Sequence, residues 1–564
     1  MSSYDPRTAP DPKETGWPSG VKYIIGNEGC ERFSYYGMKA ILFVYIVGLF
    51  VNLQGMDGKE ARDAATETMH LWSAAVYALP LIGAIISDRW LGKYRTILYL
   101  SLVYCLGHAA LAIFEGPELQ QAIFGTVLLN PIAGMYFGLA LIALGSGGIK
   151  PCVSAHVGDQ FGKGNWHMVE KVYNAFYFII NFGSAFATIF IPMLRGKVVD
   201  VTVDGVVMRT YSGSVTWAFA VPGILMGLAT FFFWAGRKEF VHVPPTHPGK
   251  RGFLDVMSGT LLFLGFLAVP IWFAEFLGSV AVTVAVSASC IVAAVVTYAA
   301  RQKIEQDDGF LAQTFYCVKA KLTAEDPGEG EAAEEGARDL RDHFFYGPAA
   351  RRFGNELAAG PVAVWKIISV FILVSVFWGL FHQHSSTWIA QARDMNRTVD
   401  MGFGAWLLTG AAMGLITGYA LVLALKKEGV GRLMWAGGGL LIGLALGWVG
   451  HHFGPYELEA SQVPAVNPFM VMLLIPYTAF GLYPLMEKMG YEPKPLRRMT
   501  IGMIMAGVSF AGIAVLQGAM DSSSTPLHVG WQLIPYLIIT LAEVMVSITG
   551  LEFAYTQAPK RMKS

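Results

Sequence analysis

Charged residues are scarce in this chain of 564 residues. Only 15 % of its residues are Asp, Glu, Lys or Arg, whereas a soluble domain has about 25 %. The mean hydropathy is +0.46, and 54 % of the residues are hydrophobic. This composition excludes an ordinary water-soluble domain and indicates a membrane protein. The 41 basic residues balance the 41 acidic ones, so no basic excess points to a nucleic-acid partner.

Cysteine is also sparse, and none of the five cysteines forms a CxxC pair. We therefore expect no disulfide framework, no zinc site and no cofactor. The sequence shows no nucleophile–base pair, metal cluster or nucleotide-binding loop, which argues against an enzyme. The first twenty residues are polar and rich in proline. They do not resemble a removable signal peptide, so we expect the first membrane helix to direct insertion.

Long apolar runs recur along the whole chain. A bilayer core of about 30 Å needs about 20 apolar residues per helix. By this measure the sequence predicts an all-α integral membrane protein with about fourteen spans. They lie at about 23–52, 70–90, 96–114, 131–155, 170–194, 216–236, 254–276, 279–300, 362–389, 403–425, 431–451, 466–487, 498–517 and 530–553.

The loops between these spans predict the orientation. If the N-terminus lies in the cytoplasm, the inside loops are rich in Lys and Arg, while the outside loop 53–69 has four acidic residues and two basic ones. This is the positive-inside pattern, and it favours a multi-pass protein of the plasma (inner) membrane with a cytoplasmic N-terminus. The polar stretch 301–360 contains EDPGEGEAAEEGARD. We expect a solvated tether there, of which parts could form short amphipathic helices.

The first predicted span carries charges at helical spacing. Its polar residues at i, i+3, i+4, i+7 and i+11 are Glu28, Glu31, Arg32, Tyr35 and Lys39. They share one helical face. An ionised side chain at the bilayer centre costs about 2.5–3.5 kcal/mol, so four facing lipid would cost roughly 10 kcal/mol. They must face protein or an aqueous cavity, either as a titratable carboxylate beside Arg32 or as plain ion pairs at the membrane edge.

Three further spans carry isolated polar groups. Lys150 precedes the helix-breaking Pro151 and is a functional candidate, with snorkelling to the cytoplasmic interface as the alternative. Asn181 lies in an apolar helix and could serve a helix–helix contact. Asn467 precedes Pro468 and could cap its helix.

The last two spans of interest carry titratable groups. His382 and His384 could hold a proton or be satisfied structural residues, and their i, i+2 spacing disfavours a metal site. Glu543 lies in the middle of a span with Ser547 one turn later, which suggests ligand or proton binding.

Six motifs occur in a fixed order. They are Glu28-x-x-Glu31-Arg32-Phe33 with Tyr35-Tyr36-Gly37; GAIISDRWLGKYRTI; GGIKP with Lys150; FYFIINFG with Asn181; Asn467-Pro468; and Glu543 with Ser547, followed by GLEFAYTQAPK. Together, over about 22–560, they resemble the proton-dependent oligopeptide transporter (POT or PTR2) family of the major facilitator superfamily. Each motif alone is weak, but the ordered set is specific.

The resemblance implies a major facilitator fold, in which two six-helix bundles surround a cavity that opens alternately to either side. The N-terminal bundle would be 1–238, an inserted transmembrane hairpin 239–300, a cytoplasmic linker 301–361 and the C-terminal bundle 362–564.

The resemblance also implies residue roles. Glu28, Glu31 and Arg32 would couple protons, together with Lys150. The peptide would meet Tyr35, Lys39, Lys150, Asn181, Asn467, Trp378, Glu543 and Ser547. Lys150 would face the peptide carboxylate and Glu543 the amino terminus, since a zwitterion needs a cation at one end and an anion at the other.

Three features depart from the family pattern. His382 stands where the family has an acid that pairs with the lysine, so either His382 titrates in its place or coupling rests on Glu28 and Glu31. The spans at about 403–451 would form a second inserted hairpin, for which the repeat of Gly439, Gly443 and Gly447 suits tight packing. The sequence ends at Ser564, so only ten core helices and two hairpins are expected, without the last two core helices.

The expected function is proton-coupled symport of di- and tripeptides by a monomer in contact with membrane lipid. One alternative is a related carrier of nitrate or of a peptide-like metabolite, because a fold does not fix its substrate. Lys150 and Glu543 together favour a zwitterion over nitrate. Another alternative is a non-transporting membrane protein, if the missing helices abolish activity.

Overall fold

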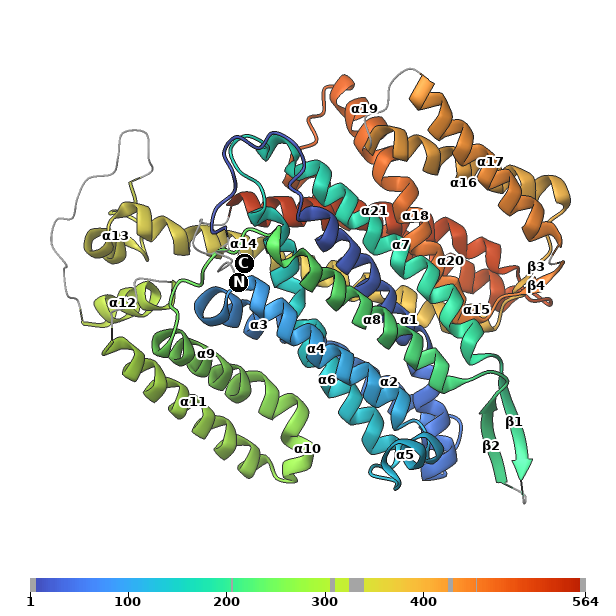
Figure 1. Cartoon of the computed structure of the whole chain (residues 1–564), viewed down its shortest axis with the longest axis horizontal. Coiled ribbons are helices and arrows are strands. Elements are labelled where there is room, and N and C mark those ends of the chain that lie inside the picture. Colours follow the sequence, from blue (N-terminus) through green and yellow to red (C-terminus); the bar gives the residue numbers. More distant parts are fainter. Residues whose placement is uncertain are drawn as a thin grey trace, which may run out of the picture.

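The computed structural model describes residues 7–203, 206–304, 310–323, 339–424, 430–452 and 454–557. These residues form a mostly helical molecule (Figure 1). Twelve of the described helices are long and apolar enough to cross a membrane, and two shorter apolar helices lie at Phe403–Leu415 and Gln462–Tyr477. These fourteen segments coincide in position with the expected spans, although the count of fourteen crossings stays a prediction. The expected chain end at Ser564 lies outside the described residues.

The N-terminal half is built on α1, which packs against α7 and α8, while α4 packs against α6. Its helices are α1 (Val21–Gln54), α2 (Glu60–Ala78), α3 (Pro80–Ile86), α4 (Lys93–Ile113), α5 (Pro117–Phe124), α6 (Pro131–Asp159), α7 (Val169–Arg195) and α8 (Val215–Ala235). A Cβ atom added at Gly183 would lie 2.7 Å from the Gly29 carbonyl oxygen. Glycine is therefore required for the close approach of α7 to the charged helix α1.

The predicted outer loop at 53–69 is largely helical, because α2 begins at Glu60, and its position outside the membrane stays a prediction. Two backbone N–H groups, of Lys59 and Glu60, donate to the Asp57 carboxylate at 2.7 and 2.9 Å. These hydrogen bonds lower the pKa of Asp57 and satisfy N–H groups at the start of the helix. Most of the expected acidic loop is thus the first turns of α2.

A β-hairpin that the sequence did not lead us to expect joins α7 to α8. Its antiparallel strands are β1 (Val198–Val203) and β2 (Val206–Tyr211). The Asn52 side chain at the end of α1 exchanges two hydrogen bonds with the Arg209 backbone, at 2.7 and 2.8 Å. The hairpin is therefore anchored to α1 and projects from the molecule (Figure 1).

The first inserted hairpin is formed by α9 (Lys250–Phe263), the π-helical stretch η4 (Leu264–Phe273), α10 (Ala274–Leu277) and α11 (Val280–Gln302). Asp255 of α9 lies 2.7 Å from the fully buried Arg301 of α11 and 4.0 Å from Arg89. The backbone N–H of Thr246 also donates to the Asp88 carbonyl. The hairpin is therefore fastened to the loop between α3 and α4.

The stretch between the two halves contains α12 (Phe310–Thr323) and α13 (Gly347–Phe353). They enclose a small core of their own that includes Cys317, Tyr346 and Ala350. The alternative that parts of this stretch form short helices is therefore correct, and these parts are not a plain tether. The acidic part of the predicted tether lies outside the described residues.

The C-terminal half supplies the other wall of the molecule. It contains α14 (Asn355–His382), α15 (Thr387–Arg393), α16 (Phe403–Ala424), α17 (Val430–His452), α18 (Val466–Tyr477), α19 (Tyr483–Lys488), α20 (Pro495–Ser522) and α21 (Leu533–Gln557). Two short strands, β3 (Thr398–Val399) and β4 (Tyr456–Glu457), pair at one end. Short 3₁₀ or π stretches are η1 (Ser87–Leu91), η2 (Trp166–Met168), η3 (Gly236–Lys238), η5 (Gln383–Ser385), η6 (Ala460–Ala465), η7 (Thr478–Leu482) and η8 (Val529–Gln532).

The second inserted hairpin, α16–α17, lies at the edge of the C-terminal half (Figure 1). Glycines of α17 face glycines of α16, and a Cβ atom at Gly443 would collide with the backbone of Gly410 and Gly414. The expected tight packing through Gly439, Gly443 and Gly447 is confirmed.

This packing predicts opposite effects for two Gly→Ala variants of α17. Gly443→Ala should destabilise the hairpin by about 1–3 kcal/mol through overpacking. Gly437→Ala should be neutral or slightly stabilising, because a Cβ atom there meets nothing within 4 Å and alanine favours a helix. Thermal unfolding in detergent, followed by intrinsic fluorescence, compares the two. Equal midpoints would contradict the packing argument.

Candidate functional site

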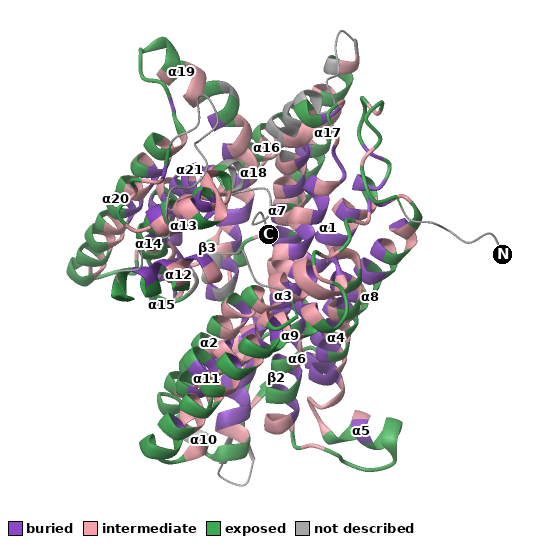
Figure 2. Ribbon diagram, turned by 90° about the vertical axis from the view of Figure 1, so that its left-hand side faces the viewer, coloured by how far each residue is buried: buried purple, intermediate pink, exposed green. Residues whose placement is uncertain are grey.

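A large cavity of about 2230 Å³ lies between the N- and C-terminal halves. Figure 2 shows the two halves from the side. Its walls come from α1, α2, α6 and α7 on one side and from α14, α18 and α21 on the other. Pockets for small molecules are usually about 300–1,000 Å³. The cavity therefore has room for a short peptide together with water.

The charged residues of α1 form one cluster in the structure. Arg32 Nε lies 2.6 Å from Glu28 Oε1 and 3.3 Å from Glu31 Oε2, as their helical spacing predicts. Both carboxylates are buried. Glu28 and Arg32 line the cavity together with Lys39, whereas Glu31 lies behind the wall. The nearer ion-pair partner of Arg32 is Glu28 rather than Glu31.

Lys150 of α6 is held by aromatic rings. Its Nζ lies 4.6 Å from the ring centroid of Tyr35 and 4.7 Å from that of Tyr77. Among the described residues no carboxylate lies within 4 Å of this nitrogen. Cation–π contacts of this kind stabilise an ammonium by about 0.5–2 kcal/mol. The two tyrosine rings are thus the contacts that the structure shows for the Lys150 ammonium.

Tyr35 does not lie where the sequence suggested. It is 2 % exposed and lies behind the cavity wall, where it stacks on Trp72 with ring centroids 5.9 Å apart. Tyr36, its neighbour, lines the cavity instead. The contact of Tyr35 with a substrate therefore stays a prediction, whereas its ring lies against the Lys150 ammonium.

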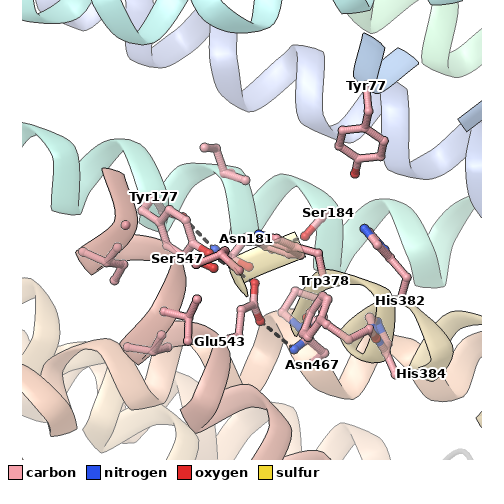
Figure 3. Close-up of a pocket in the computed structure, with 18 of the residues that line it drawn as sticks. Tyr77, Tyr177, Asn181, Ser184, Trp378, His382, His384, Asn467, Glu543 and Ser547 are labelled. Atoms are coloured by element: carbon pink, nitrogen blue, oxygen red, sulfur yellow. Dashed lines mark hydrogen bonds between the residues drawn. The ribbon is translucent and has the colours of Figure 1, made fainter. Parts of the chain in front are cut away.

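Glu543 of α21 lies at the junction of the two halves. It accepts hydrogen bonds from Tyr177 OH of α7 at 3.2 Å and from Asn467 Nδ2 of α18 at 2.9 Å, as Figure 3 shows. Asn467 also donates to Thr540, so its side chain holds Glu543 and does not cap its helix. Asn181 Nδ2 donates to the Tyr177 carbonyl at 2.9 Å.

The histidines of α14 and η5 differ in their surroundings. His382 lines the cavity, with its ring 5.8 Å from those of both Tyr77 and Trp378. His384 is nearly buried, and its Nδ1 lies 2.6 Å from the Phe381 carbonyl oxygen. Trp378 and Ser547 also line the cavity. The Tyr77 ring therefore lies next to both His382 and Lys150. The Nδ1 atom of His384 already has a hydrogen-bond partner in the backbone.

Among the cavity residues that sequence reasoning missed are Tyr177, His70 and Tyr77. Tyr177 belongs to the same FYxxINxG motif as Asn181, and that motif could have suggested it. His70 and Tyr77 lie on α2 and line the cavity. His70, a titratable residue in an apolar run, was a usable signal, but nothing in a single sequence distinguishes Tyr77 from other aromatic residues.

These features define a multi-pass α-helical membrane protein with a cavity between its two halves, and charged side chains from both halves line that cavity. The profile of the POT family (PTR2) matches residues 94–269 and 445–564, which together are just over half of the chain. This protein belongs to the POT family. The second inserted hairpin lies mostly between the two matched stretches.

Similar curated proteins include a solute carrier and a peptide transporter. The chain is 28 % identical to human solute carrier family 15 member 2 over 540 residues, which cover 95 % of this chain and 54 % of the relative. It is 29 % identical to peptide transporter family 1 of Drosophila melanogaster, covering 91 % and 50 %. The chain spans about half the length of the curated relatives it matches.

A solved structure is similar over most of its length. The crystal structure of the POT family transporter PepTSo is 32 % identical, with a TM-score of 0.60, and the match covers 97 % of this chain and 85 % of that one. The similarity thus extends to the arrangement of the helices.

Proposed function

We propose that this protein is a proton-coupled symporter of di- and tripeptides that works by alternating access. The observation that carries the proposal is the placement of Lys150 and Glu543 on walls of one cavity, in different halves of the chain. A peptide zwitterion presents a carboxylate and an ammonium group at opposite ends, so it complements both. The names of the family and of similar proteins support peptides as the substrate class.

The contact between Tyr177 and Glu543 suggests how binding is linked to movement. The bond joins α7 of one half to α21 of the other. A peptide ammonium that pairs with Glu543 would compete with the Tyr177 hydroxyl for the carboxylate. Binding would therefore loosen one link between the halves, and two halves that separate at one end of a cavity open it to that side.

The α1 cluster is the proposed proton site. Glu28 and Glu31 are held by one guanidinium, so one of these carboxylates can accept a proton while the other keeps the ion pair with Arg32. Lys150 is close enough to interact electrostatically with both acids. A peptide carboxylate that binds Lys150 would thereby change the charge balance around the proton site.

The proposal also covers the location, the partners and an alternative substrate of the protein. The protein would act as a monomer in the plasma membrane with its N-terminus in the cytoplasm, and its partners would be small peptides, protons and lipid. A carrier of nitrate or of a peptide-like metabolite is the alternative. A carboxylate such as Glu543 on the cavity wall repels an anion, which disfavours nitrate.

Competition in counterflow tests the substrate class. Proteoliposomes are loaded with unlabelled dialanine, and entry of radiolabelled dialanine is measured against external competitors. We expect di- and tripeptides to compete strongly, and tetraalanine, free alanine and nitrate to compete weakly. Stronger competition by nitrate than by dialanine would contradict the proposal.

His382 gives a separate prediction about pH. Imidazole titrates near neutral pH, and the charged or titratable groups that act electrostatically on His382 include Lys39, Lys150, His70 and His384. If His382 replaces the missing acid, His382→Gln should flatten the dependence of dialanine uptake on external pH between about 5.5 and 7.5. An unchanged pH profile would contradict a role of His382, and proton coupling would then rest on Glu28 and Glu31 only.

A further inference from the structure

The first inserted hairpin donates a hydrogen bond to a helix of the cavity wall. The indole Nε1 of Trp272, in η4, donates to the backbone carbonyl of Leu71 in α2 at 2.9 Å. Leu71 follows His70 directly, and Tyr77 lies less than two turns further along the same helix. The bond therefore reaches the segment of α2 that carries two cavity residues.

On its inner side this segment of α2 is held by Trp72, whose indole Nε1 donates to the Leu139 carbonyl of α6 at 3.0 Å. The membrane span that contains α2 has only 17 % of its apolar window buried, against 56–61 % for those containing α1 and α6. The helix is also interrupted at Leu79, because Pro80 has no N–H to donate to the carbonyl one turn earlier. Tyr77 lies just before this interruption, so its position depends on the contacts that hold α2 on its inner side, through Trp72, and on its outer side, through Trp272.

The inserted hairpin is built to fix it. At its inner end Asp255 pairs with Arg301 and approaches Arg89 beside η1, which ties α9 to the chain directly after α3. Further along, η4 is a π-helix of ten residues that contains Pro270. π-helical turns are rare and are frequently found at functional sites. Phe263 stacks on the Trp272 indole, with ring centroids 6.3 Å apart.

We infer that Trp272 is a positioning residue, which sets α2 so that Tyr77 contacts both Lys150 and His382. The inference rests on the proposed function for its meaning in transport. The inserted hairpin would thereby shape the substrate cavity, because it fixes the position of α2. Trp272 itself does not line the cavity.

Trp272→Phe keeps the ring but removes the donor. The Leu71 carbonyl keeps its own helical hydrogen bond, so the variant should fold. We expect the KM for dialanine to rise about three- to tenfold, with a smaller change in the maximal rate, which corresponds to the loss of one hydrogen bond. Trp365→Phe is the matched control, because its indole donates to Tyr346 at 2.7 Å and Trp365 does not line the cavity.

A double-mutant cycle tests whether the effect passes through Tyr77. If it does, Trp272→Phe should have no further effect in a Tyr77→Phe background, since coupled residues are non-additive. Full additivity of the two variants would overturn the inference, as would wild-type kinetics in Trp272→Phe.

A second measurement does not require transport. Ser73 of α2 lines the cavity, and Ser73→Cys can be modified by a charged methanethiosulfonate reagent in detergent. We expect Trp272→Phe to change this rate at least about threefold and Trp365→Phe to leave it unchanged. An unchanged rate in Trp272→Phe overturns the inference even if the protein carries no peptide, whereas absent peptide uptake with a changed rate contradicts only the proposed function.

Discussion

Glu543→Gln is expected to raise the KM for dialanine by about 10- to 150-fold, because a hydrogen bond to a charged group is worth about 1.5–3 kcal/mol. The glutamine side chain has the same shape and can still bond Tyr177 and Asn467, so the change removes charge and little else. Uptake of radiolabelled dialanine into proteoliposomes, as a function of concentration, measures the effect.

A modified substrate shows whether the loss concerns the amino terminus. Wild-type protein should discriminate strongly against N-acetyl-dialanine, which lacks the ammonium group, and Glu543→Gln should largely lose this discrimination. Glu492→Gln is the control, because Glu492 is an exposed residue paired with Lys494 and should behave as wild type. Equal discrimination in wild type and Glu543→Gln would place the amino terminus elsewhere.

Glu31→Gln is expected to abolish accumulation driven by a proton gradient and to spare counterflow exchange. Glutamine retains the size of Glu31 but cannot take up a proton, and Glu28 still holds Arg32 at 2.6 Å. The cavity should therefore still bind peptide and still exchange it. Gradient-driven accumulation and counterflow are compared in the same vesicles.

The exposed Glu118, which lies on α5, provides the matched control as Glu118→Gln. It should keep both activities. If Glu31→Gln accumulated dialanine as wild type does, Glu31 would have no part in coupling. If it lost counterflow as well, its role would be in folding or binding and not in coupling.

The charged face of α1 could be predicted from the sequence because its contacts are local. Glu28 and Arg32 are one helical turn apart, so their pairing follows from helix geometry. The facing glycines of the α16–α17 hairpin were similarly visible in the repeat of Gly439 and Gly443. Within one helix or one hairpin, spacing determines which side chains meet.

The surroundings of Lys150 and Glu543 could not be predicted in this way. Tyr35 and Tyr77 reach Lys150 from two different helices, and Tyr177 reaches Glu543 from the other half of the chain. Such contacts depend on how helices cross, which periodicity does not encode. The motif that contains Tyr177 marked the right helix, but not the residue that contacts the other half.

The short elements outside the membrane helices were missed for another reason. The strands β1 and β2 are six residues each and follow a long apolar helix, so hydropathy alone merges them with a loop. α12 and α13 lie beside an acidic stretch of low complexity, and the composition of that stretch predicted a solvated tether for the whole segment. The small core around Cys317 and Tyr346 forms only when the two helices meet.

The most direct test of the central claim is the uptake of radiolabelled dialanine by the 564-residue chain in proteoliposomes with an imposed inward proton gradient. The proposed symport predicts accumulation above equilibrium that collapses when a protonophore dissipates the gradient. Uptake that is the same with and without the gradient, or no uptake at all, would contradict proton-coupled peptide transport by this chain.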